Sequence, residues 1–189
     1  DGKDLSILRK IEQLDSGINF PNNRMPEGDE SRRNDDAGIT HVHHFYTKRN
    51  LLVLANIWNE IIKNGNPRLK FWFTSALTWC GKENRLHLGN YFGKTGGVIT
   101  SLRGTWYISS LPVETNVLER FKLRAKSTLV QSPVKSSIDL VSCQSATGLN
   151  NIPKEIFDYI FIDPPFGSNL MYSELNFLWE SWLSVQSNN

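Results

Sequence analysis

The chain has 189 residues, enough for one domain with a full core or for one domain with a small appendage. Its six Trp, ten Phe and five Tyr indicate a packed globular protein and exclude a disordered one. A formal charge of +2 excludes a generally basic surface, so nucleic acid would have to bind at a local basic patch. No apolar run is long enough to cross a membrane, and the two widely separated cysteines indicate reduced thiols in a cytoplasmic protein.

The first forty residues predict a helix followed by a polar loop. Apolar residues recur at helical spacing over residues 4–15, and residues 17–39 are rich in polar and charged side chains. We interpret the charge cluster around Arg32 and Arg33 as a solvated loop in preference to a phosphate contact. We therefore divide the chain into residues 1–40 and a main domain over residues 41–189.

Three histidines follow the loop and raise the question of a metal site. On an extended strand His41 and His43 would point the same way, but His44 would point away and no third ligand lies nearby in the sequence. We therefore expect ordinary polar histidines.

The next two segments predict helices. Thr47 is a good N-cap, apolar residues then recur at helical spacing, and Gly65 is a typical helix end. Residues 68–79 are apolar on almost every side, as in a helix buried in a core. The glycines of residues 89–97 do not have phosphate-loop spacing, and β-forming residues at 98–100 and 105–109 predict a hairpin.

Residues 114–126 predict a helix that carries the strongest basic cluster of the chain. Arg120, Lys122, Arg124 and Lys126 lie outside its apolar stripe. Both a contact to a nucleic-acid backbone and a merely solvated face fit this pattern.

The clearest chemical signal lies in residues 159–167. Residues 159–162 are apolar and predict a short strand buried on both faces, as in a parallel sheet. Asp163 ends this run, at the strand edge where open α/β folds bind their ligands. Pro164 and Pro165 then stiffen the chain and leave its carbonyls free, and Phe166 adds an aromatic face.

These groups suit the exocyclic amine of a nucleobase. The lone pair of such an amine is delocalised into the ring. The Asp163 carboxylate and the Pro164 carbonyl can each accept one N–H hydrogen, which favours a pyramidal nitrogen aimed at an electrophilic methyl group. Phe166 can stack on a base that has been flipped out of its duplex.

The tetrapeptide over residues 163–166 resembles the catalytic D-P-P-[YF] motif of S-adenosylmethionine-dependent amino-methyltransferases, above all the N6-adenine DNA methyltransferases. Residues 38–40, 45–52, 111–117 and 171–175 are similar to segments of large bacterial DNA methylases. The likeness covers residues 20–183. It implies an α/β fold, with part of a Rossmann-like methyltransferase sheet and a helical, loop-rich insertion, and it implies DNA as the partner.

The resemblance also assigns weaker roles. Ser145 occupies the position where the family has an Asp near the cofactor adenine, and Tyr172 and Glu174 fall at the mouth of the expected pocket. Arg120 and Arg124 become candidates for substrate binding. The glycine-rich turn that binds S-adenosylmethionine in the family does not occur in this sequence. We therefore expect a fragment of a longer protein that is inactive by itself.

Two other functions stay open at this point. Methyltransferases that act on N2 of guanine in ribosomal RNA share the tetrapeptide, and a non-catalytic DNA-binding module could retain it. The residues identify neither a target sequence nor a nuclease partner of a restriction–modification system.

Overall fold

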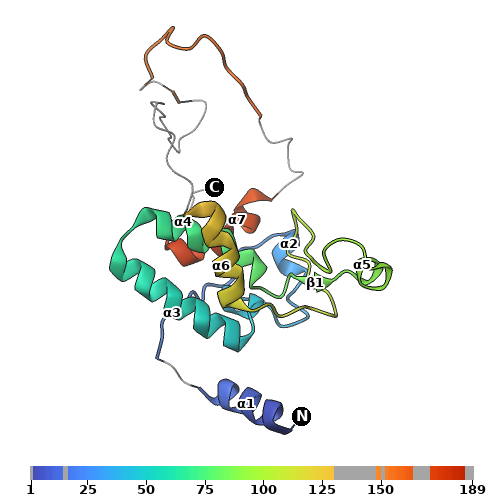
Figure 1. Cartoon of the computed structure of the whole chain (residues 1–189). Helices are drawn as coiled ribbons and strands as arrows, with labels where there is room; N and C mark the ends of the chain where they lie inside the picture. The colour runs from blue at the N-terminus through green and yellow to red at the C-terminus, as the bar shows by residue number, and fades with distance from the viewer. Residues whose placement is uncertain (1, 15–16, 130–147, 150–151, 164–170, 186–189) are drawn as a thin grey trace. The chain divides into compact units, whose positions relative to one another are not determined.

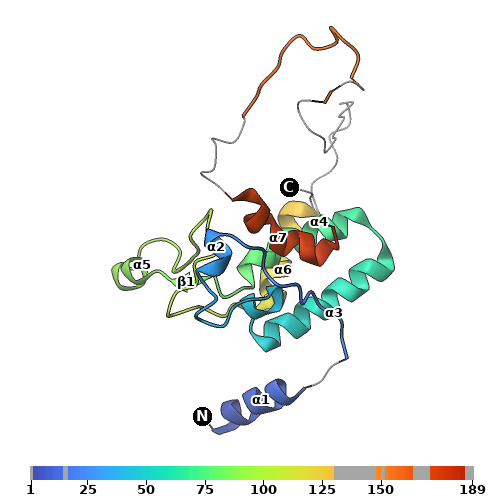
Figure 2. The same cartoon turned by 180° about the vertical axis from the view of Figure 1, so that it is seen from behind.

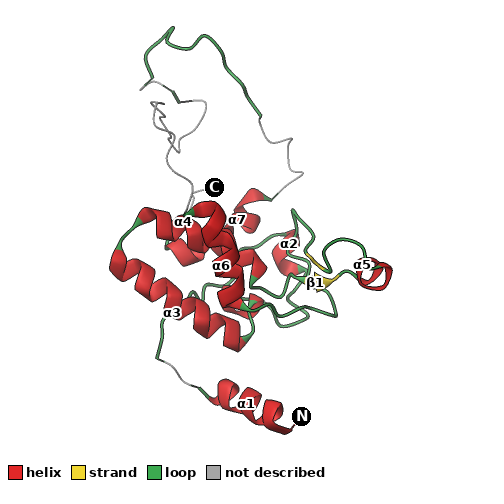
Figure 3. Cartoon of the chain, viewed as in Figure 1, coloured by secondary structure: helices red, strands yellow, loops and turns green. Residues whose placement is uncertain are grey.

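The structure is a computed structural model that describes residues 2–14, 17–129, 148–149, 152–163 and 171–185. It divides into two compact units, Asp1–Gln131 with Met171–Asn189, and Ser132–Leu170. All described helices and strands belong to the first unit. The described part is mixed α/β and mainly helical, with one two-stranded sheet, and it does not confirm a Rossmann-like sheet (Figure 3).

Short helices and strands connect the longer helices of the first unit (Figure 1). In chain order the elements are α1 (Gly2–Gln13), α2 (Asp29–Arg32), η1 (Val42–Phe45), α3 (Lys48–Asn64), α4 (Pro67–Ala76), η2 (Leu77–Trp79), β1 (Arg85–Leu86), α5 (Leu88–Gly93), β2 (Ile99–Thr100), α6 (Val117–Thr128) and α7 (Tyr172–Leu183). None of these described helices combines the length and the apolar character needed to cross a membrane.

The helix α3 confirms the sequence prediction at both ends. The Thr47 hydroxyl accepts a hydrogen bond from the Asn50 amide at 3.2 Å, as an N-cap does. Gly65 adopts the left-handed conformation with φ 73°, and its amide donates to the Ile61 carbonyl at 3.0 Å. The predicted helices over residues 4–15, 68–79 and 114–126 correspond to α1, to α4 with η2, and to α6.

An aromatic cluster joins α3, α4, α6 and α7. The Trp58 and Phe73 rings lie 4.7 Å apart, and Phe73 also lies 5.2 Å from Trp182 and 5.6 Å from Phe121. The Trp182 indole N–H donates to the Tyr46 hydroxyl at 3.3 Å. Because burial of such side chains stabilises a fold by roughly 1.5–3 kcal/mol each, this cluster contributes to the stability of the first unit. Figure 2 shows α7 beside α4 from behind.

The predicted hairpin of residues 98–100 with 105–109 is wrong. β2 instead pairs antiparallel with β1, with Arg85 opposite Thr100 and Leu86 opposite Ile99. Residues 105–109 form no strand, and the carboxylate of Glu30 instead accepts hydrogen bonds from the Thr105 hydroxyl and, at 3.1 Å, from the Trp106 amide. A side chain from the polar loop thus takes the place of a partner strand.

Glu83 is a buried carboxyl group next to this core. Its side-chain oxygens have no hydrogen-bond partner among the described residues, and burial raises the pKa of the carboxyl to about 8. A Cβ atom at Gly81 would lie 1.9 Å from its Oε2, so the carboxyl occupies space that only a glycine leaves free. Glu83 is therefore protonated in the folded protein at neutral pH.

We predict that Glu83 makes the folded state less stable as the pH rises. The pKa of Glu83 in the folded state, about 8, lies above the ordinary value of 4.5. The contribution of Glu83 to the free energy of unfolding is therefore complete below pH 4.5 and is lost as the pH rises to 8. Between pH 5 and pH 8 the wild type should lose more free energy of unfolding than Glu83→Gln, by on the order of 3 kcal/mol. Urea denaturation at each pH measures the difference. The exposed Glu60→Gln is the control. Equal pH dependence in the wild type and in Glu83→Gln would contradict the assignment.

Candidate functional site

The apolar run before Asp163 is not the buried strand that the sequence predicts. Tyr159, Ile160, Phe161 and Ile162 are between 68% and 80% exposed, and no strand is assigned to them. A central strand needs strands that pair with both of its edges and layers that cover both of its faces, and the described residues supply no strand partner to this segment. Asp163 follows this run and is exposed, as a carboxylate that meets a ligand must be.

Four of the expected site residues lie outside the described residues. These are Pro164, Pro165 and Phe166 of the tetrapeptide and Ser145 of the expected cofactor turn. Of the four expected catalytic residues, Asp163 is the only one that the structure describes.

Tyr172 and Glu174, which the resemblance placed at one pocket mouth, differ in exposure. Both lie in the first turn of α7, but Tyr172 is 49% exposed and Glu174 only 2%. Oε2 of Glu174 accepts a hydrogen bond at 2.7 Å from the amide of Ser31 in α2. Successive residues of a helix point in different directions, so one side chain turns to solvent and the other into the core. Glu174 is a structural residue that holds α2 against α7.

The approach of Gly28 to this carboxylate gives a test. A Cβ atom at Gly28 would lie 2.0 Å from Oε1 of Glu174, which is buried. We predict that Gly28→Ala lowers the free energy of unfolding by about 1–3 kcal/mol, because the carboxylate must leave its position under the α2 amides. Urea denaturation measures the change.

Gly97→Ala is the matched control, since its Cβ atom would meet the Ile99 carbonyl at an ordinary 3.9 Å. Equal destabilisation of the two variants would show that the contact between Gly28 and Glu174 is not the cause.

Arg120 and Arg124 meet on one aromatic ring. Their guanidinium carbons lie 5.4 and 5.5 Å from the centroid of the Trp79 ring. Both side chains are half-buried, whereas Lys122 and Lys126 are exposed, so the four cations do not form one uniform outer face. Sequence spacing predicted the two arginines on one helix but gave no signal for Trp79. Two guanidinium groups beside one indole ring bring two positive charges together, and guanidinium groups suit phosphates and bases.

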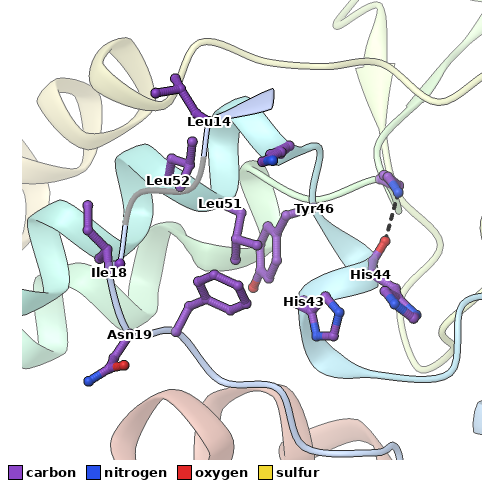
Figure 4. Close-up of a pocket in the computed structure, with 12 residues that line it drawn as sticks. Leu14, Ile18, Asn19, His43, His44, Tyr46, Leu51 and Leu52 are labelled. Atoms are coloured by element: carbon purple, nitrogen blue, oxygen red, sulfur yellow. Dashed lines mark hydrogen bonds between the residues drawn. The ribbon is translucent and has the colours of Figure 1, made fainter. Parts of the chain in front are cut away.

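A cavity in the described part of the chain lies next to the histidines (Figure 4). It has a volume of about 580 Å³ and lies between residues 17–20, η1 and the start of α3. The rings of His43 and His44 are 4.2 Å apart, and those of His41 and His43 are 5.6 Å apart. The three histidines thus gather around a short helical turn and do not alternate along a strand.

Burial lowers the pKa of two of these histidines, His43 and His44. Burial, with the nearby His44 and His41, lowers the pKa of His43 to about 4, and its Nδ1 has no hydrogen-bond partner among the described residues. Burial also lowers the pKa of Lys82, whose ammonium group donates to the His44 carbonyl at 2.8 Å. Within the described ranges, no group of three or more His, Cys, Asp or Glu side chains is placed to hold a metal ion.

The cavity beside the histidines does not suit S-adenosylmethionine. The cavity is lined by Lys48 and Lys82 and by no Asp or Glu, and two ammonium groups disfavour the positive sulfonium of that molecule. Gly96 and Gly97 follow a helix and precede a strand, the reverse of the order in a dinucleotide-type glycine turn. No step involving the methyl donor is therefore derived from these residues.

No protein-family model, no curated protein and no solved structure matches the chain. The likeness to DNA methyltransferases rests on the residues quoted for it.

Proposed function

We propose that the full protein transfers a methyl group from S-adenosylmethionine to the N6 amine of adenine in DNA. The observation that carries the proposal is the sequence Asp-Pro-Pro-Phe at residues 163–166 directly after an apolar run. The exposure of Asp163 supports it, because this carboxylate is free to meet a flipped base.

Asp163 positions the amine in this proposal. Its carboxylate accepts one N–H hydrogen of the adenine amine, and the Pro164 carbonyl accepts the other. The two acceptors favour a pyramidal nitrogen whose lone pair is available for the methyl group. Phe166 stacks on the base and offsets part of the cost of unstacking it.

The exposure of the apolar run is an argument for a larger sheet in the full protein. Burial of a large apolar side chain stabilises a protein by roughly 1.5–3 kcal/mol, so the exposure of Ile160, Phe161 and Ile162 is unfavourable. Pairing with strands outside the described residues, in a sheet whose faces are covered by helices, would bury these side chains and make the run a central strand. We propose that this sheet is the Rossmann-like sheet of the methyltransferase fold and that the reaction takes place in the cytoplasm.

The guanidinium groups above Trp79 are the proposed DNA contact of the first unit. Arg120 and Arg124 carry positive charge on a planar face, and the nearest described acid on α6, Glu119, pairs with Lys122 at 2.9 Å. Both arginines are therefore available for phosphate oxygens.

Asp163→Ala in the full protein tests the proposal. We predict that methylation of adenine falls by on the order of 100-fold or more, because a preorganised hydrogen-bond acceptor at the reacting nitrogen is lost. Thermal unfolding should not change, since the side chain is exposed and packs little.

Asp158→Ala is the control for this measurement, because Asp158 is an exposed carboxylate five residues earlier. Its methylation rate should equal that of the wild type. Full turnover in Asp163→Ala would refute the role given to Asp163, and N2-methylguanine in RNA as the product would favour the ribosomal RNA alternative.

A further inference from the structure

Residues 85–100 form a projection that the methyltransferase proposal does not use. β1 and β2 form its base and α5 its tip, and we call residues 85–100 the finger. Figures 1 and 2 show α5 at the end of a loop that extends away from α3, α4 and α6. Residues 87–98 are exposed except for Asn90, so the finger contributes little to the core.

Hydrogen bonds hold the finger in one shape. The His87 amide donates to the Val98 carbonyl at 2.8 Å, and the Asn90 side chain donates to the Gly97 carbonyl at 2.8 Å. At the base, the buried Asn84 side chain donates to the Thr78 carbonyl at 2.7 Å. The finger is therefore a preformed element of the fold.

Large apolar side chains gather at the tip. Phe92 is 76% exposed, Tyr91 55% and Leu88 51%. The Tyr91 and Phe92 rings lie 5.2 Å apart in an edge-to-face arrangement. Exposed apolar groups that gather in this way mark an interaction site, since water contact costs free energy that a partner can recover.

The positive charge of the finger and of the residues beside it favours an anionic partner. Residues 84–113 contain Arg85, Lys94 and Arg103 but no Asp or Glu, although the whole chain has 19 acids in 189 residues. In the part of the chain that the structure describes, none of these three cations forms an ion pair with a carboxylate. The Nε of Arg85 is buried without a hydrogen-bond partner there.

We propose that the finger binds duplex DNA and that Tyr91 and Phe92 insert between its base pairs. Cations beside an apolar tip contact phosphates, and apolar wedges that enter the minor groove open base steps in proteins that distort DNA. The inference rests on the proposed function, because an adenine must leave the stack before its amine can react. Tyr91 and Phe92 of the finger enter the stack of base pairs beside this adenine.

The test measures binding of the 189-residue chain to a fluorescein-labelled 24-base-pair duplex by anisotropy, over a series of salt concentrations and without a methyl donor. Phe92→Ala and Tyr91→Ala should each weaken binding about tenfold. They should leave the salt dependence unchanged, because no charge is removed. Lys94→Gln should make the slope of log affinity against log salt shallower by about one.

Phe71→Ala is the matched control, since Phe71 is 64% exposed but lies on α4. It should bind within twofold of the wild type. Equal affinity of Phe92→Ala and Phe71→Ala would overturn the proposal, as would absence of duplex binding or tighter binding to single-stranded RNA. Methylation does not enter this measurement, so its result is independent of the Asp163 test.

Discussion

The packing of α7 against segments far earlier in the chain is the constraint on which the first unit depends. Three indole N–H groups define it. Trp182 donates to the Tyr46 hydroxyl at 3.3 Å, Trp179 to the Thr74 carbonyl at 3.0 Å, and Trp106 to the Glu174 carbonyl at 2.8 Å. These bonds join residues 68 to 136 positions apart. Because the rings are also packed against one another, the core and the position of α7 are set together.

This constraint is relevant to the proposed function because α7 follows the proposed catalytic residues closely in the sequence. The Asp-Pro-Pro-Phe tetrapeptide ends at residue 166, and α7 begins at Tyr172. The burial of Glu174 beneath α2 fixes the first turn of that helix. The first turn of α7 is therefore held in place within the first unit.

Sequence analysis predicted the parts of the fold whose causes are local. Thr47 and Gly65 specify α3 because both act within one helical turn. The sequence did not predict the features that depend on contacts between residues far apart in the chain. The buried partner of Glu174 is Ser31, 143 residues away, and Trp79 reaches Arg120 and Arg124 only through the packing of α6. Residues 159–162 have the composition of a buried strand, but strand formation needs partner strands that composition does not supply.

We propose that Asp163 belongs to an enzyme that methylates adenine in DNA. The most direct measurement incubates the full protein with isotope-labelled S-adenosylmethionine, DNA and RNA, and then identifies the labelled nucleoside by mass spectrometry. We predict labelled N6-methyl-deoxyadenosine from the DNA. Labelled N2-methylguanosine from the RNA, or no labelled nucleoside at all, would contradict the claim.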